Sequence, residues 1–403
     1  MANRKNDLTR RSLMIATLAS AIMPTIAMAQ SRPPIKIGLI LPFKGIWAPI
    51  AESMDRGYKM ALDEVGNQVG GRPIEIIRAD DELNPSVGVQ RFNKLVQSDQ
   101  VDIVAGVIGS NVAIALSELA DRAKKPTVFV GAFADEVTGK YCSPYVARTS
   151  FSANGLQYNA GKYFATHGIK TVVTMGADYA AGHSWLDAFK RGFEEAGGKV
   201  VQEVWTPFQK TKDWGPALTQ ASNSGAQIIY SIYAGSEAAQ VVKQHAEFGL
   251  RDKLPLIGDQ WLFDEALWPA MGDLVFGGKF IASYFPGYDS PDNKKFVAEF
   301  VKNFGKEPDV NAALGYDNAK AILAALERLG GAMPVDGAQF ISTLRSVEFQ
   351  SGRGLIRFNK QNSALLEQEF VIEIVKGPDG KPTRKLLDTF AGADDLHTCT
   401  KSF

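Results

Sequence analysis

The sequence predicts an α/β fold made of two lobes, each built around a parallel-rich sheet. Three observations support this fold class. The chain has 403 residues, of which 45% are hydrophobic, and a single core stops growing near about 250 to 300 residues. Short apolar runs alternate with amphipathic stretches from residue 34, and the alternation restarts near Tyr158. Strands separated by helices of about 10 to 15 residues indicate βαβ units and parallel sheets.

The first unit opens on IKIGLIL, a run apolar enough for a buried strand. The next segment carries apolar residues at helical spacing, from Ile50 through Met54 and Tyr58 to Val65. We expect strands at 35–41, 73–79, 101–105 and 126–130, and helices at 50–66, 85–97 and 112–123.

The second unit repeats this order without a residue-by-residue sequence repeat. We expect helices at 154–167, 183–196, 214–224 and 236–248, and strands at 171–175, 200–205, 227–232 and 254–257. The remaining chain predicts helices at 292–304, 314–329 and 337–346, and strands near 355–358, 369–375 and 385–390. This mixed ending suggests that the chain crosses between the lobes more than once, with candidate crossings at 148–152, 279–284 and 351–358. Ligands of open α/β sheets bind beyond the carboxyl ends of the strands, so two facing lobes predict a cleft.

The first 29 residues have the layout of a secretory signal. Four basic residues, ending in Arg10-Arg11, outnumber Asp7 by three, and an apolar run follows up to Ala27-Met28-Ala29. The segment around the two arginines is similar to a twin-arginine export motif. The alternative is an uncleaved N-terminal helix. Removing this segment from a chain of net charge zero leaves a mature protein of charge −3 and predicts a soluble periplasmic protein.

The compartment affects how the two cysteines, Cys142 and Cys399, are interpreted. They are either two reduced thiols or one disulfide, and an oxidising periplasm favours the disulfide.

Several functional classes lack support in the sequence. A balanced charge provides no basic excess for nucleic-acid binding. Beyond the first thirty residues no apolar run is long enough to span a membrane. Nucleophile-elbow, Walker and dinucleotide motifs are absent. The four histidines (His167, His183, His245 and His397) have no metal-ligand spacing, so we expect neither a metal nor a cofactor.

The candidate binding residues follow the predicted strands. Ser110 and Asn111 open the helix that follows Gly106–Gly109, where a helix N-terminus favours an anion; Ser110 could equally be an ordinary helix cap. Ala132 and Phe133 follow the next strand and offer backbone contacts and a ring. Aromatic residues also follow other strands or open helices, and aromatic walls with few polar groups are typical of small-ligand pockets. These residues are Trp47, Tyr179, Tyr233, Trp261 and Tyr316.

In these segments the chain resembles the type I periplasmic solute-binding proteins of ABC importers, in particular the leucine/isoleucine/valine-binding group. The resemblance covers most of residues 34–376 and rests on the order of IKIGLILPFKG, ADDELNP, VDIVAGVIGSNVAIALSELA, CSPYVARTSFS, ADYAAG and YDNAKAILAAL. It implies two Rossmann-like lobes joined by a three-strand hinge. It also implies capture of a small ligand between the lobes and delivery to a membrane permease, by a protein that we expect to be a monomer and not an enzyme.

The implied domains are discontinuous. After the signal peptide at 1–29, lobe 1 comprises 30–150 and 282–352, and lobe 2 comprises 151–281 and 353–380. Residues 381–403 form a tail that a Cys142–Cys399 disulfide, a habit of this family, would tie back near the hinge.

The resemblance also assigns ligand contacts. The family serine that binds the ligand carboxylate matches Ser110, and the backbone position after the fourth strand matches Ala132. The family threonine and acidic residue that hold the ligand ammonium group are Phe133 and Gln260 here, and a family tyrosine is Ala181. Without both partners for its ammonium group, a zwitterionic ligand loses more binding free energy than one charge-assisted hydrogen bond contributes, which is about 1.5 to 3 kcal/mol.

These departures favour a hydrophobic or aromatic carboxylate as the ligand, with an aliphatic amino acid such as leucine as the alternative. If Asp259 rather than Gln260 faces the ligand, the amino acid regains favour. An alternative of another class is a secreted α/β hydrolase, which would require His183 or His245 within reach of Ser110.

Overall fold

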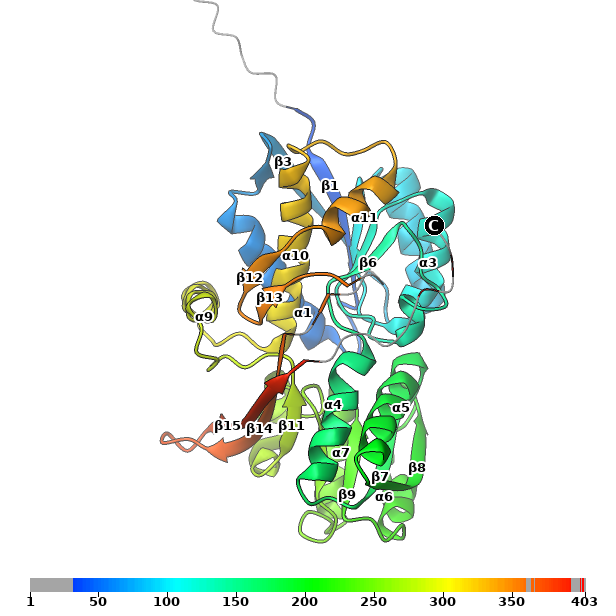
Figure 1. The fold of residues 1–403 in the computed structure, drawn as a ribbon, viewed down its shortest axis with the longest axis vertical. Coiled ribbons are helices and arrows are strands. Elements are labelled where there is room, and N and C mark those ends of the chain that lie inside the picture. The colour runs from blue at the N-terminus through cyan, green and yellow to red at the C-terminus, as the bar shows by residue number, and fades with distance from the viewer. Residues whose placement is uncertain (1–31, 360–363, 366, 393–398, 400, 402–403) are drawn as a thin grey trace, which may run out of the picture.

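A computed structural model describes residues 32–359, 364–365, 367–392, 399 and 401, and the expected signal peptide lies outside them. The described chain forms two α/β lobes, one above the other in Figure 1, each with its own sheet. The two-lobe, parallel-rich α/β prediction is confirmed.

The first lobe is built on a six-stranded sheet of order β2-β3-β1-β4-β5-β6. All its neighbours are parallel except β2, which pairs antiparallel with β3. Its strands are β1 (Ile35–Leu41), β2 (Gln68–Val69), β3 (Arg72–Asp80), β4 (Ile103–Gly106), β5 (Thr127–Phe129) and β6 (Val146–Arg148). Its helices are α1 (Ala48–Glu64), α2 (Pro85–Asn93), which continues into a π-helical turn at Lys94–Ser98, α3 (Ser110–Ala123), α10 (Val310–Arg328) and α11 (Gly337–Arg345).

The second lobe is built on a seven-stranded sheet of order β15-β14-β11-β10-β9-β7-β8. Its strands are β7 (Thr171–Asp178), β8 (Lys199–Pro207), β9 (Ile228–Ile232), β10 (Leu256–Asp259), β11 (Lys279–Ala282), β14 (Gln368–Lys376) and β15 (Pro382–Ala391). Its helices are α4 (Ala153–Thr166), α5 (Ala180–Glu195), α6 (Gly215–Ser222), α7 (Ser236–Glu247) and the short α8 (Trp268–Met271). Three 3-10 turns lie at Asp135–Val137, Glu265–Leu267 and Gly272–Val275.

Local sequence explains where these elements begin. β1 is almost wholly buried, as its unbroken apolar run requires between two helical layers. Proline stands in the first turn of α1 and α2, where its missing N–H costs nothing. Asp309 caps α10 by accepting a hydrogen bond from the Ala312 N–H at 2.8 Å. Capping therefore moves the start of this helix four residues ahead of the predicted Leu314.

The chain passes between the lobes three times. It leaves the first lobe after β6, returns from β11 through α9 (Pro291–Phe304) to α10, and leaves again after the small antiparallel pair β12 (Phe349–Ser351) and β13 (Gly354–Ile356). The predicted crossings at 279–284 and 351–358 overlap β11 and β13, respectively. The strand expected near 355–358 overlaps β13, whereas the four residues of β11 are too few for a period to be read from the sequence.

The C-terminal residues form strand β15 and a disulfide bond. β15 pairs antiparallel with β14 along its whole length, so residues 382–391 extend the second sheet rather than forming a separate tail. Cys142 and Cys399 form a disulfide with a Cα–Cα distance of 5.6 Å, which confirms the predicted pairing. This bond joins the end of the chain to the first lobe.

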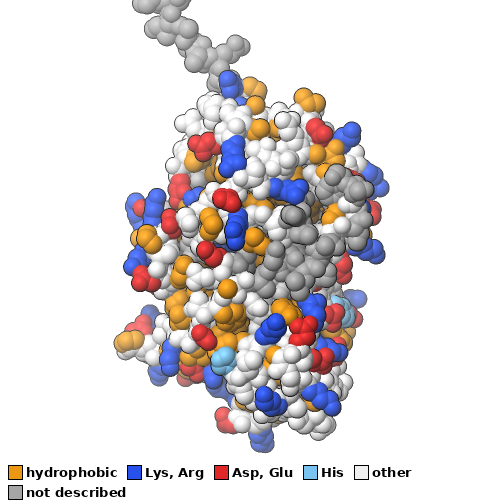
Figure 2. All heavy atoms as spheres, viewed as in Figure 1, with side chains coloured by type: hydrophobic (Ala, Val, Ile, Leu, Met, Phe, Trp, Pro, Cys, Tyr) orange, Lys and Arg blue, Asp and Glu red, His pale blue; other side chains and the backbone are white. Residues whose placement is uncertain are grey.

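The surface is ordinary for a protein with balanced charge. Acidic and basic side chains are interspersed on the face shown in Figure 2. In the described part of the chain, no helix combines the length and the apolar character that crossing a bilayer requires.

Candidate functional site

A partly open pocket of about 510 Å³, a volume that includes its open mouth, lies between the lobes at the carboxyl ends of the strands. The first lobe contributes Trp47, Ile50, Ile108 and Phe133. The second lobe contributes Ala177, Tyr179, Ala181, Trp185, Phe208, Ile232, Tyr233, Ala234, Glu237, Asp259 and Trp261.

Aromatic rings from both lobes meet at this pocket. Phe133 of the first lobe lies 4.8 Å from Trp261 and 5.3 Å from Trp185, measured between ring centroids. On the other side, Trp47 lies 5.7 Å from Phe208, which stacks on Tyr179 at 4.2 Å. Since these contacts join the lobes, the structure represents a closed cleft with two aromatic walls.

The first lobe presents its pocket residues on strained backbone. Val107 and Ala132 have φ angles of 58° and 54°, in the left-handed region that residues other than glycine rarely adopt. Each directly precedes a wall residue, Ile108 or Phe133. Such a conformation costs about 1 to 3 kcal/mol and persists where surrounding contacts hold it, often at functional sites.

Asp259 places a carboxyl group in this apolar wall at the end of β10. Its Oδ1 accepts hydrogen bonds from the backbone N–H groups of Trp261 at 3.1 Å and Leu262 at 3.0 Å. Its Oδ2 is buried without a hydrogen-bond partner. Burial raises the pKa of Asp259 to about 7, although the two backbone bonds oppose the rise. The group can therefore be neutral or charged near neutral pH.

Glu237 provides a second carboxyl group from the first turn of α7. Its Oε1 accepts the backbone N–H of Gln209 at 3.0 Å. Burial raises its pKa to about 7. Two titratable acids thus line the pocket, and its lining residues include no lysine or arginine.

Two indole groups of the pocket have unused donors. The Nε1 atoms of Trp47 and Trp185 are buried and have no hydrogen-bond partner in the structure. A buried N–H group without a partner is unfavourable by about 1 to 3 kcal/mol. A ligand oxygen that reached either group would satisfy it.

Half of the predicted ligand contacts lie on this wall, namely Trp47, Phe133, Tyr179, Tyr233 and Trp261. Ser110, Asn111 and Ala132 are not among the residues that line the pocket. The Ser110 hydroxyl accepts the N–H of Ala134 at 3.1 Å, and the Asn111 amide donates to the Leu83 carbonyl at 3.4 Å. Ser110 is the first residue of α3, not its cap, and its hydroxyl is used within the lobe.

Gln260 and Tyr316 do not line the pocket. The Gln260 Oε1 accepts hydrogen bonds from the backbone N–H and the hydroxyl of Ser283, at 2.7 and 3.0 Å. At this pair of positions it is Asp259 that lines the pocket. Tyr316 lies inside α10 and donates to the Glu64 carboxylate of α1 at 2.8 Å, away from the cleft.

Sequence reasoning missed Trp185, Phe208 and Glu237. Trp185 falls within a predicted helix, where an aromatic residue at helical spacing is typical of the core. Glu237 has the pattern of an acidic first-turn residue that complements the helix dipole. Phe208 directly follows β8, so the search of strand ends that found Tyr233 could also have found it.

Neither His183 nor His245 is placed as the hydrolase alternative requires. A His183 ring nitrogen lies 2.8 Å from Asp178, and a His245 ring nitrogen lies 2.8 Å from the Leu254 carbonyl. Ser110 has neither as a partner. Among the described residues, no group of three or more His, Cys, Asp or Glu side chains is placed to hold a metal ion.

Comparisons with known proteins agree with this geometry. A family model described as periplasmic binding protein matches residues 34–379. A curated relative, Leu/Ile/Val-binding protein homolog 6 of Brucella melitensis, is 28% identical over 94% of this chain and 98% of its own.

Two solved structures share both the fold and part of the sequence. An ABC transporter solute-binding protein from Rhodopseudomonas palustris BisB5, in complex with 3,4-dihydroxybenzoic acid, is 30% identical, with a TM-score of 0.82 over 90% of this chain and 99% of that one. Another from R. palustris, in complex with benzoate, is 28% identical, with a TM-score of 0.83 over 91% and 100%. The chain therefore belongs to the periplasmic binding protein family, as a substrate-binding protein of an ABC transporter.

Proposed function

We propose that this protein captures a small aromatic or hydrophobic carboxylate in the cleft and delivers it to the permease of an ABC importer. The observation that carries the proposal is the pair of aromatic walls, one on each side of the pocket between the lobes. Such walls suit a benzoate-type ring, because stacked or edge-on ring contacts contribute about 0.5 to 1.5 kcal/mol each beyond burial. Relatives crystallised with benzoate and with 3,4-dihydroxybenzoic acid support the same ligand class.

The polar groups of the pocket suggest how the acid is held. The free N–H groups of Trp47 and Trp185 are donors that a carboxylate oxygen could accept from. Asp259 and Glu237 favour such an anion when they are protonated, and their pKa values of about 7 allow this. A hydroxyl group on the ligand ring would offer a donor to the unpartnered Asp259 Oδ2.

The second candidate ligand is an aliphatic amino acid such as leucine. Asp259 lies in the pocket with one unpartnered oxygen, and an ionised Asp259 could pair with an ammonium group. This is the arrangement in which the amino acid regains favour.

Calorimetry with benzoate, 3,4-dihydroxybenzoate and leucine at pH 6.5 separates the two candidates. We expect the aromatic acids to bind at least about tenfold more tightly than leucine, a difference of about 1.4 kcal/mol. Trp185→Phe replaces the indole with a smaller aromatic ring that has no N–H, so it should weaken benzoate about fivefold or more. Tight leucine binding with no aromatic acid binding would reject the proposal.

We also propose that residues 1–29 direct export to the periplasm and are removed. N-terminal sequencing of the protein recovered from periplasm should begin at Gln30. Arg10→Lys together with Arg11→Lys should leave the precursor in the cytoplasm if the twin-arginine route is used.

A further inference from the structure

We propose that Asn311 of α10 is a positioning residue that couples closure of the cleft to assembly of the pocket wall. Its amide ties two second-lobe residues, Trp261 and Asp264, to the first lobe. The inference rests on the proposed function only for its ligand-binding arm, because closure can be measured without a ligand.

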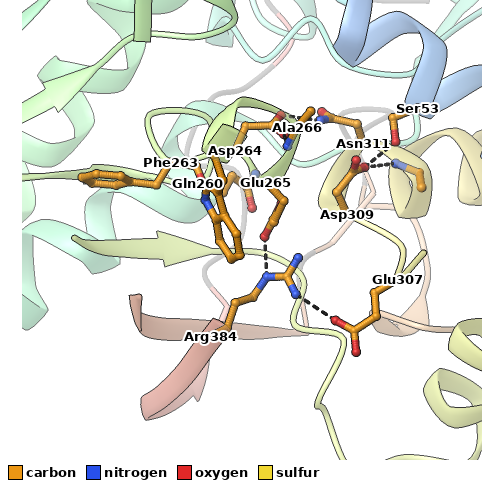
Figure 3. Close-up of polar contacts among 12 residues, drawn as sticks. Ser53, Gln260, Phe263, Asp264, Glu265, Ala266, Glu307, Asp309, Asn311 and Arg384 are labelled. Atoms are coloured by element: carbon orange, nitrogen blue, oxygen red, sulfur yellow. Dashed lines mark hydrogen bonds and ion pairs between the residues drawn. The ribbon is translucent and has the colours of Figure 1, made fainter. Parts of the chain in front are cut away.

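The contacts of Asn311 cross the cleft. Its Oδ1 accepts a hydrogen bond from the Trp261 indole Nε1 at 3.0 Å. Its Nδ2 donates to the Asp264 Oδ2 at 2.7 Å. All three side chains are buried, and Figure 3 shows Asn311 beside Asp264 at the junction of the two lobes.

A carboxamide suits this position for a chemical reason. An indole N–H can only donate, so Trp261 requires an acceptor. An ionised Asp264 requires a donor, and its Oδ1 already accepts the Ala266 N–H at 2.9 Å. An amide presents a donor and an acceptor at once, whatever the pH. Leucine at this position would leave two buried polar groups unpaired in the closed form.

The surroundings hold Asn311 in place and concentrate charge around it. Asp309, which caps α10, also accepts from the Ser53 hydroxyl of α1 at 2.6 Å, so the first turn of α10 is fixed to the first lobe. Asp264 is buried near the carboxylates of Asp309 and Glu265, and burial with these like charges raises its pKa.

An ion-pair bridge lies beside the amide. Arg384 of β15 pairs with Glu265 and reaches Glu307, on the segment leading to α10, at 3.2 Å (Figure 3). This bridge spans the same junction as Asn311. Arg384 pairs with Glu265 and Glu307, the two further carboxylates labelled in Figure 3. The donor that Asp264 receives from the other lobe is therefore the Asn311 amide.

Trp261 links this junction to the ligand. Its ring lines the pocket and lies 4.8 Å from Phe133 and 5.0 Å from Trp185. When the lobes separate, Asn311 must leave Trp261, and the indole is no longer held in this orientation. Closure and the shape of the wall therefore change together.

The test compares Asn311→Leu with Asn159→Leu in the ligand-free protein. Asn159 donates to Glu369 and to the Ala391 carbonyl, at 2.9 and 3.0 Å, entirely within the second lobe, so its variant is the matched control. We measure hydrogen exchange of the Trp261 indole N–H by ¹⁵N NMR and the radius of gyration by small-angle X-ray scattering. We expect about tenfold faster exchange or more, with a larger radius, in Asn311→Leu only.

Asn311→Asp provides a second test that a purely structural role would not reproduce. It keeps an acceptor for Trp261 but turns a carboxylate toward Asp264, in a site that also contains Asp309, Glu265, Glu307 and Arg384. At low pH a shared proton restores the donor, so this variant should match the wild type near pH 5 and open as the pH rises to 8.

Binding of benzoate and leucine forms the last arm. If benzoate binds the wild type, Asn311→Leu should raise its dissociation rate at least about tenfold, and Asn159→Leu should not. If neither probe binds the wild type, the proposed ligand class fails while the ligand-free comparison still decides this inference. Exchange and radius that are unchanged in Asn311→Leu, or no pH-dependent opening in Asn311→Asp, would overturn it.

Discussion

Asp259 and Glu237 both line the pocket, and burial raises the pKa of each to about 7. Below that pH the wall is largely neutral, and above it the wall gains up to two negative charges. The affinity for an anionic ligand should therefore fall as the pH rises from 6 to 8. We expect the affinity to fall about tenfold for each carboxyl group that ionises, a free-energy difference equal to a shift of about one pKa unit.

Calorimetry with benzoate at pH 6, 7 and 8 measures this dependence. Asp259→Asn keeps an oxygen acceptor for the two backbone N–H groups and cannot ionise, so it should flatten the profile, as should Glu237→Gln. An affinity that increased with pH would show instead that an ionised acid pairs with a cationic ligand.

The same two groups affect the stability of the folded chain. A carboxyl group with a raised folded-state pKa binds more protons when folded than when unfolded between about pH 4 and pH 7. Its contribution is therefore fully present below about pH 4 and is lost as the pH rises through 7. In the ligand-free protein, Asp259→Asn should make the midpoint of urea unfolding less dependent on pH across this window.

At the scale of elements, the crossing of α1 and α10 depends on two glycines. A Cβ on Gly57 would lie 2.0 Å from the Ala312 backbone oxygen, and one on Gly315 would lie 2.1 Å from that of Met54. The helices can approach this closely only because both residues lack a side chain. The turn of α10 that bears Asn311 is placed by this contact.

Gly57→Ala should therefore reduce the free energy of unfolding by about 2 to 3 kcal/mol, as overpacking does in other cores. Guanidinium titration measures it. Glu52→Ala, an exposed change on the same helix, should stay within about 0.5 kcal/mol of the wild type. Equal stability of the two variants would show that the helices can separate at little cost.

Elements with a clear period could be predicted from the sequence, but some of the short ones could not. The amphipathic stretch at 50–66 and the apolar run at 35–41 match α1 and β1 within two residues. β2 has two residues and β6 has three, too few for an alternation to show. Contacts across the cleft were predictable only at strand ends, which is why Trp185, inside a helix, and the orientation of Gln260 toward Ser283 were missed.

At the scale of the molecule, the disulfide joins residues separated by 257 positions. In the chain-entropy model, closing so long a loop stabilises the fold by up to about 5 kcal/mol. Cys142→Ser with Cys399→Ser should lower the guanidinium midpoint while ligand binding persists, because neither cysteine lines the pocket. Wild type in reductant is the control, and an unchanged midpoint in both would contradict the expectation.

The two lobes could be predicted from the sequence because strands and helices alternate along it. The cysteine pairing could be predicted because the expected compartment, the periplasm, is oxidising. The antiparallel addition of β14 and β15 to the second sheet was not, since the runs at 369–375 and 385–390 indicate strands but not their neighbours. Pairing partners are decided by tertiary contacts, which a local pattern does not contain.

The disulfide also turns most of the chain into a covalent ring. All three passages between the lobes lie between Cys142 and Cys399, so each belongs to this ring. A single proteolytic cut at any of them leaves one connected molecule, whose pieces separate on a gel only after reduction. Such a nicked protein could still open and close, with the intact passages serving as its pivots.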